Sequence, residues 1–287
     1  MDRALVLGGG GPVGIAWEAG LAAGLLAEGV DLARADRTIG TSAGSFVGAH
    51  LAAGQPALEL YEAQIALSRQ DAAERASSNE RLPQPDPTPF LALVIRPLEE
   101  GETPEMRRVK MGKLALSTKT ISEDAFIGRF GQSLRGLSWP KGFVCTTVDA
   151  LTGAFRLWEE RDGVELARAI ASSCSVPGIF PPITIKGRRY IDGGARSPTC
   201  VDVAAGARRV VTLAVVGAMA REPYLARIAE ESKALGDAAQ VLITPDEAAL
   251  GVFGPNLMNV ADRAAVARSG YDQGCREAER VGRLWGL

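Results

Sequence analysis

Short apolar segments typical of buried strands alternate with longer segments of helical periodicity along most of this 287-residue chain. Strand-like runs lie at residues 4–7, 38–39, 143–148, 155–158, 183–185, 190–191, 210–216 and 240–244. Helices are expected at about 14–28, 44–53, 56–76, 164–173 and 224–235, with a last one ending near Leu284. This alternation is typical of an α/β fold in which helices cover both faces of a sheet.

A less regular segment interrupts the pattern between about residues 70 and 120. Its first half has no periodicity and carries four closely spaced prolines, Pro83, Pro85, Pro87 and Pro89. In its second half, a run of cations and apolar residues over 106–114 contains Gly112, which weakens a helix there. We therefore predict a single domain, 1–287, with a loop-like insertion or lid at about 70–120.

Composition excludes several classes of protein. Apolar residues make up 46% and charged residues 23%, as in globular proteins, and the net charge of −2 lacks the basic excess of a nucleic-acid-binding protein. No run reaches the roughly 20 apolar residues that span a bilayer. The four cysteines have no metal-binding spacing and there is one histidine, so we expect reduced thiols, no metal and a cytoplasmic location.

A glycine-rich run, Gly8 to Gly14, follows the first expected strand and precedes the first expected helix. Without Cβ atoms its backbone N–H groups can approach an anion, and the helix N-terminus favours negative charge there. The run also contains the GxGxxG spacing of a dinucleotide site, at Gly9, Gly11 and Gly14. Asp31 and Asp36 are the candidates for the acidic residue that such a site requires, although the strand after them leads into a different motif.

The second motif is GxSxG, from Gly40 to Gly44, again between an expected strand and helix. A sharp turn here would lift the Ser42 hydroxyl out of the sheet as a nucleophile, whereas the simpler interpretation is that Ser42 caps the helix. His50 lies eight residues along the same helix, or ~12 Å at 1.5 Å per residue. A general base needs hydrogen-bond reach of about 3 Å, so we expect His50 to be a surface or packing residue.

The third motif is Tyr190-Ile191-Asp192-Gly193-Gly194, an apolar strand that ends in an aspartate and two glycines. Alone it is typical of an Asp-Gly turn. Beside a GxSxG serine without a histidine, Asp192 becomes the natural carboxylate partner. Burial between apolar strands would raise its pKa from the usual value of about 3.9 toward that of a base useful at neutral pH.

In this order the three motifs closely resemble the patatin-like phospholipase family, and residues 172–182 resemble that family's loop before the aspartate strand. The resemblance implies a three-layer α/β/α fold with a mostly parallel sheet. It also implies that Ser42 is the nucleophile and Asp192 the base. The backbone N–H groups implied for the oxyanion hole are those of Gly9, Gly10, Gly11 and Ala43. Further glycines support the motifs, namely Gly14, Gly40, Gly44, Gly193 and Gly194.

Two positions depart from the family pattern. Val13 stands where the glycine loop usually carries Arg or Lys, and Ser197 stands before Pro198 where Asn is common. Loss of the cation could weaken recognition of an anionic headgroup. Neither departure touches the two catalytic candidates, but both leave the substrate open.

The first functional hypothesis is a lipid acyl hydrolase, acting on phospholipid, lysophospholipid or a related acyl ester through an acyl-enzyme and without a cofactor. The second is acyl transfer through the same intermediate, and the third is a nucleotide-binding regulatory protein. The partners expected are an acyl lipid and no nucleic acid. The basic run at 106–114 is a candidate for membrane-surface contact, although a solvated charged face is the simpler interpretation. The oligomeric state stays open.

Overall fold

The computed structural model describes residues 1–77, 86–131, 133–259 and 262–286. Its strands are β1 (Arg3–Leu7), β2 (Arg37–Gly40), β3 (Phe143–Asp149), β4 (Phe155–Trp158), β5 (Ile183–Ile185), β6 (Arg188–Asp192), β7 (Arg209–Leu213) and β8 (Ala239–Ile243). Its helices are α1 (Gly11–Ala27), α2 (Ala43–Ala52), α3 (Ala57–Ser77), α4 (Thr88–Ile95), α5 (Pro104–Ser117), α6 (Glu123–Gly131), α7 (Leu166–Ser173), α8 (Arg221–Ser232), α9 (Glu247–Phe253) and α10 (Arg263–Trp285).

The strands form one sheet in the order β5-β6-β3-β2-β1-β7-β8, and β4 pairs with β3 beside this path. The pairs that join β3, β2, β1, β7 and β8 are parallel. The pairs β3–β4, β3–β6 and β5–β6 are antiparallel. Each strand expected from the sequence is present within a few residues of its expected position, and the mostly parallel sheet is confirmed.

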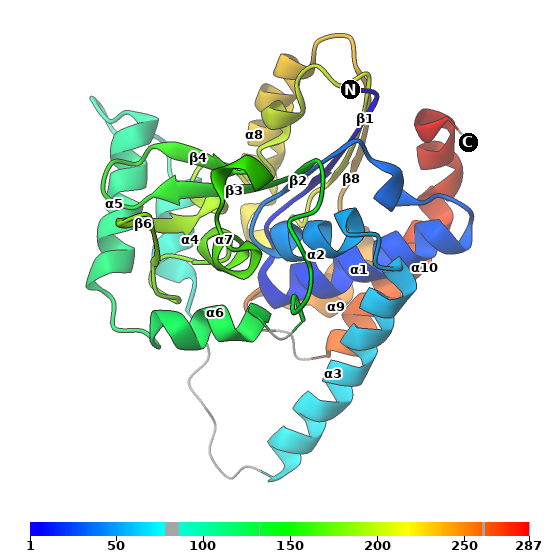
Figure 1. Ribbon diagram of the computed structural model, residues 1–287, viewed down its shortest axis with the longest axis horizontal. Coiled ribbons are helices and arrows are strands. Elements are labelled where there is room, and N and C mark those ends of the chain that lie inside the picture. Colours follow the sequence, from blue (N-terminus) through cyan, green and yellow to red (C-terminus); the bar gives the residue numbers. More distant parts are fainter. Residues whose placement is uncertain (78–85, 132, 260–261, 287) are drawn as a thin grey trace.

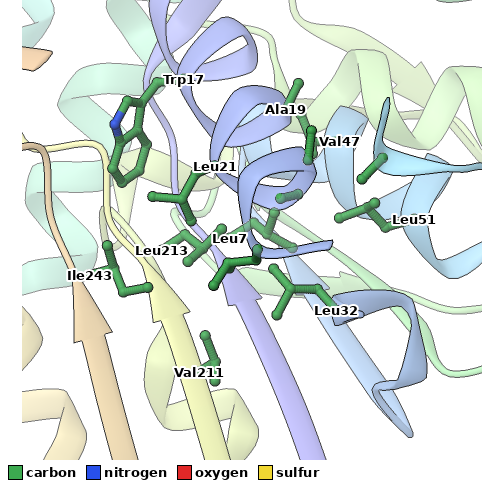
Figure 2. Close-up of a cluster of buried hydrophobic side chains, with 14 of the residues drawn as sticks. Leu7, Trp17, Ala19, Leu21, Leu32, Val47, Leu51, Val211, Leu213 and Ile243 are labelled. Atoms are coloured by element: carbon green, nitrogen blue, oxygen red, sulfur yellow. The ribbon is translucent and has the colours of Figure 1, made fainter. Parts of the chain in front are cut away.

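Alternation along β1 divides the core into two faces. Leu5 and Leu7 pack with side chains of α1, α2 and α10, whereas Ala4 and Val6 pack with those of α8. Figure 1 shows α1, α2 and α10 on one side of β1 and α8 on the other. In Figure 2 apolar side chains of α1 and α2 meet those of β1, β7 and β8, all of them buried. A layer of helices therefore covers each face of the parallel half of the sheet.

The other half of the sheet is covered in the same way. Adjacent residues of β6 point to opposite faces, so Tyr190 packs with the cluster of α6 and α7, and Ile191 with that of α4 and α5. Phe126 of α6 and Met111 of α5 are both buried. This arrangement confirms the three-layer α/β/α fold.

The segment expected to be loop-like contains α4 and α5. Thr103 caps α5 by accepting a hydrogen bond from the Met106 N–H, and Pro104 occupies the first turn, where its missing N–H costs nothing. Gly112 does not break α5, which continues through it to Ser117. Glycine is needed at this position because the helix lies so close to the end of β3 that a Cβ would be 1.8 Å from the Ala150 carbonyl oxygen. Two of the four prolines also mark a helix start, Pro87 at the N-cap of α4 and Pro89 in its first turn. Pro83 and Pro85 lie outside the described residues.

Glycines bring the first and last long helices into backbone contact. A Cβ at Gly20 would lie 2.0 Å from the Ala267 carbonyl oxygen, and one at Gly24 would lie 2.0 Å from the Tyr271 oxygen. Gly270 and Gly274 of α10 approach α1 in the same manner. These contacts therefore pack α10 closely against α1. Within the described ranges, no helix is long and apolar enough to cross a membrane.

Candidate active site

The glycine loop and the GxSxG turn leave the sheet at the same edge. β1 and β2 are parallel neighbours with Leu7 opposite Gly40, so the segments that follow them emerge side by side. Two backbone hydrogen bonds join these segments, from the Thr41 N–H to the Leu7 oxygen (3.0 Å) and from the Gly44 N–H to the Gly8 oxygen (2.9 Å). A Cβ at Gly44 would lie 2.3 Å from the Leu7 oxygen, which explains why this position is glycine.

The register of β3 brings Asp192 to Ser42. Residues 145–148 of β3 pair with β4 along one edge, so β2 and β6 must share the other edge, which they approach from opposite ends. Gly40 of β2 lies opposite Cys145, and Asp192 of β6 lies opposite Thr147. The residues that follow each strand therefore converge beside Thr146, whose hydroxyl lies 2.8 Å from that of Thr41.

Ser42 adopts a conformation that residues with side chains rarely adopt, with φ 52° and ψ −118°. Such a backbone costs on the order of 1–3 kcal/mol and persists only where its surroundings hold it. The Ser42 N–H donates to Ser173 Oγ (2.9 Å), while its carbonyl accepts from Ser45 Oγ (2.6 Å) and Cys174 Sγ (3.2 Å). The Ser42 side chain forms no helix-capping hydrogen bond, so the capping interpretation is wrong.

Asp192 is buried, with 2% of its surface exposed. Its Oδ1 accepts a hydrogen bond from the Gly194 N–H (2.7 Å), whereas its Oδ2 has no hydrogen-bond partner among the described residues. Burial raises the pKa of Asp192 to about 7, and the Gly194 N–H and the nearby Ser42 hydroxyl only partly oppose this by favouring the ionised form. The carboxyl group is thus poised to exchange a proton near neutral pH.

Backbone N–H groups without a described partner lie at the N-termini of the two helices beside Ser42, α1 and α2. Gly10 and Gly11 lie at the start of α1 and Ala43 at the start of α2, and no described residue accepts a hydrogen bond from their N–H groups. Gly9 differs from the expectation, because its N–H donates to the Pro198 carbonyl (2.8 Å). Gly11 has φ 57°, which favours glycine, and a Cβ there would lie 2.8 Å from the Leu257 oxygen.

A cavity of about 420 Å³ opens in front of Ser42 and Asp192. The glycine loop forms one wall, and the rest is largely apolar. Its apolar and aromatic lining includes Phe90, Leu91, Val176, Tyr224, Leu257 and Met258. Phe90 and Leu91 belong to α4, so the segment expected to be a lid supplies part of the cavity wall. A cavity of this kind suits an acyl chain whose ester carbonyl lies at Ser42.

The remaining candidates lie away from this cavity. His50 is buried in α2, where its Nδ1 lies 2.6 Å from Gln55 Oε1 and its ring packs edge-on against Phe46, so its packing role is confirmed. Asp36 accepts hydrogen bonds from the Asp2 and Arg3 N–H groups at the amino end of β1, opposite to the glycine loop. Asp31 accepts from the Ala33 N–H in a short turn. Neither carboxylate is placed as the GxGxxG interpretation requires.

The two departures from the family pattern have structural roles. Val13 lies in the first turn of α1 and is fully buried in the core. Ser197 donates to Glu231 Oε2 (2.6 Å) and accepts from the Cys200 N–H (2.8 Å). No group of three His, Cys, Asp or Glu side chains suited to a metal ion occurs in the part of the chain that is described.

Two of three comparisons relate the chain to known proteins. A family model described as patatin-like phospholipase matches residues 5–205. Among solved structures, VipD from Legionella pneumophila is similar with 13% identity and a TM-score of 0.46 over 97% of this chain and 67% of that one. The type III effector protein ExoU is similar with 18% identity and a TM-score of 0.41 over 97% of this chain and 53% of that one. No curated protein sequence matches significantly. The family model spans all three motifs.

Proposed function

The chain belongs to the patatin-like phospholipase family and is a lipid ester hydrolase, and from this premise we propose that Ser42 and Asp192 form its catalytic dyad. The observation that carries the proposal is the pairing of a strained serine with a buried carboxyl group. The pKa of that carboxyl group is raised to about 7, and one of its oxygens has no described partner. A buried group with this pKa suits a general base at neutral pH.

In the first half of the reaction, Ser42 Oγ attacks the carbonyl carbon of the ester and its proton passes to the Asp192 carboxylate. The carbonyl oxygen becomes an oxyanion. When the tetrahedral intermediate collapses, the bond to the alcohol oxygen breaks and Asp192 returns the proton to that leaving alcohol. The acyl group then remains on Ser42 as an ester.

In the second half, a water molecule attacks the acyl carbon and gives its proton to Asp192. The bond to Ser42 Oγ breaks, the proton returns to Ser42, and the fatty acid leaves. An acceptor alcohol in place of water would give acyl transfer, which remains an alternative that added acceptors would reveal as new products.

The oxyanion hole belongs to the same proposal. We assign it to the N–H groups of Gly10, Gly11 and Ala43, because these donors have no described partner and begin the helices beside Ser42. Gly9 is left out, since its N–H already donates to Pro198. One such donor is typically worth about 3 kcal/mol of transition-state stabilisation.

Contact with a lipid surface is a further part of the proposal. Apolar side chains that are more than a third exposed gather in the segment of α4 to α6, namely Ile95, Leu98, Met106, Leu116 and Ile121. Three of the four cations in the basic run at 106–114 are already paired, Arg107 with Glu102, Arg108 with Glu105 and Lys110 with Glu99. We therefore expect apolar insertion rather than attraction to anionic lipid to govern this contact.

A cytoplasmic location is also part of the proposal. It is supported by the four cysteines, all of them free thiols, because disulfides are rare in a reducing compartment. That residues 1–287 form a single domain is likewise retained as a hypothesis.

A fluorophosphonate probe tests the nucleophile directly. We expect the probe to label the wild-type protein at Ser42, identified by mass spectrometry of the tryptic peptides, because an activated serine attacks phosphorus as it does an ester. Ser42→Ala should not be labelled, and Ser117→Ala, which changes an exposed serine at the end of α5, should keep the label on Ser42. Label on another residue, or none at all, would contradict the assignment.

A further inference from the structure

A second cavity, of about 210 Å³, adjoins the one in front of Ser42. The two cavities share Gly194, Pro198 and Tyr224 in their linings. The second is distinguished by four arginines, Arg107, Arg108, Arg196 and Arg227. Among the described residues that line it, none is Asp or Glu. We call this space the arginine cavity.

The four arginines come from three parts of the fold. Arg107 and Arg108 lie on α5, Arg196 follows the Asp192-Gly193-Gly194 segment, and Arg227 lies on α8. Each is fixed by an acid that lies outside the lining. The ion pairs are Arg107–Glu102 (3.3 Å), Arg108–Glu105 (2.5 Å), Arg196–Asp202 (2.5 Å) and Arg227–Glu231 (2.7 Å). Such pairing holds the guanidinium groups in place before any ligand arrives.

These ion pairs leave guanidinium donors unused. Arg227 donates to Glu231 through Nε alone, so no described residue accepts from its two Nη atoms. Arg108 uses Nε and Nη2, for the Gly153 oxygen and Glu105. Arg107 donates through Nη1 to the Arg96 oxygen and through Nη2 to Glu102, and each of these atoms carries a second N–H. A planar guanidinium with N–H groups to spare matches the oxygens of a phosphate group well.

We propose that the arginine cavity is a binding site for a phosphate group. Together with the proposed function, on which this step rests, the shared wall of the two cavities points to a phosphate-bearing lipid substrate. Its acyl ester would lie at Ser42 and its headgroup among the arginines. The same chemistry would also accept free phosphate, so the experiment distinguishes these two sources.

The headgroup is tested with two substrates that differ only in the phosphate, 1-oleoyl-lysophosphatidic acid and 1-oleoylglycerol. We expect kcat/KM of the wild type to be at least tenfold higher for the phosphate-bearing lipid. The double variant Arg107→Gln/Arg227→Gln should lower the ratio of the two kcat/KM values at least tenfold, and Arg227→Lys, which keeps the charge, should lower it less than Arg227→Gln. Arg283→Gln is the matched control, because Arg283 also pairs four residues away, with Glu279 of α10.

Free phosphate is tested by calorimetric titration of the Ser42→Ala protein with inorganic phosphate, which requires no turnover. Phosphate binding that is lost in Ser42→Ala/Arg107→Gln/Arg227→Gln, without a substrate preference, would assign the cavity to the free ion. If the double variant does not fold, Arg227→Gln alone serves, since this side chain is 43% exposed. Equal kcat/KM for both lipids together with no phosphate binding would overturn the site while leaving the hydrolase intact. No ester hydrolysis at all would overturn the proposed function, and the titration would still decide the site.

Discussion

At the scale of single residues, burial of Asp192 is what makes the proposed chemistry feasible. A solvated aspartate has a pKa of about 3.9 and is a weak base. Removal from water disfavours its charged form and raises its pKa to about 7. The same position therefore combines a proton acceptor useful at neutral pH with a carboxylate that water does not solvate.

This pKa predicts the pH dependence of hydrolysis. Only the ionised Asp192 can accept the proton of Ser42, so kcat/KM for a neutral ester should rise with pH through a midpoint near 7. At pH 6 we expect about a tenth of the plateau value, since one pH unit below the pKa leaves about a tenth of the groups ionised. Steady-state kinetics between pH 5 and 9 measure it. A profile that is flat from pH 5 to 8 would contradict the role of Asp192.

The sequence predicts Ser42 and Asp192 because each ends a recognisable strand and stands beside glycines. It does not predict the groups that hold Ser42, because Ser173 and Cys174 lie more than 130 residues further along the chain and their local pattern does not show which residues they contact. Nor does it predict that the Gly9 N–H is occupied. That contact depends on where Pro198 lies, which only the folded chain determines.

At the scale of elements, strands were easier to predict than the helices of the 70–120 segment. Period-two alternation and continuous apolar runs mark strands, whereas Pro87, Pro89 and Gly112 resemble helix breakers until their positions are known. Pro87 and Pro89 prove to mark a helix start. Gly112 was expected to weaken a helix, but it instead allows α5 to pack closely against the sheet.

The close approach of Gly112 to Ala150 predicts that a methyl group at position 112 destabilises the protein. Gly112→Ala would place a Cβ 1.8 Å from the Ala150 oxygen, so α5 must move and the free energy of unfolding should fall by about 1–3 kcal/mol. Gly128→Ala in α6 is the matched control, since no atom lies within 4 Å of a Cβ there. Removal of an exposed helical glycine should raise stability by about 0.5–1 kcal/mol. Urea unfolding measures both, and a stabilised Gly112→Ala protein would contradict the packing described.

At the scale of the whole molecule, the contact between α1 and α10 unites regions that the sequence analysis treated separately. The glycine loop begins α1, and α10 is outside the residues that the family model matches. Neither this contact nor the arginine cavity could be predicted, because both depend on tertiary packing between segments more than 80 residues apart. The overall α/β/α class could, because alternation of elements restricts the ways in which their apolar faces can be buried.

The close contact between α1 and α10 predicts that α10 stabilises the whole fold. In Gly24→Ala a Cβ would lie 2.0 Å from the Tyr271 oxygen, so α1 and α10 must separate and the melting temperature should fall by several degrees. Gly251→Ala, at an exposed position of α9 where a Cβ meets nothing within 4 Å, should instead raise the melting temperature slightly, as expected for Gly128→Ala. Thermal unfolding followed by circular dichroism measures both. Equal melting temperatures for the two variants would contradict the close contact.

The most direct test of the Ser–Asp dyad is hydrolysis of p-nitrophenyl butyrate by the wild type, Ser42→Ala and Asp192→Asn. Circular dichroism confirms beforehand that each protein is folded. We expect turnover by the wild type and a loss of at least a thousandfold in kcat/KM for both variants, because either change removes a group needed in the first step. Substantial turnover by Asp192→Asn would contradict the account, since an amide cannot accept the proton of Ser42.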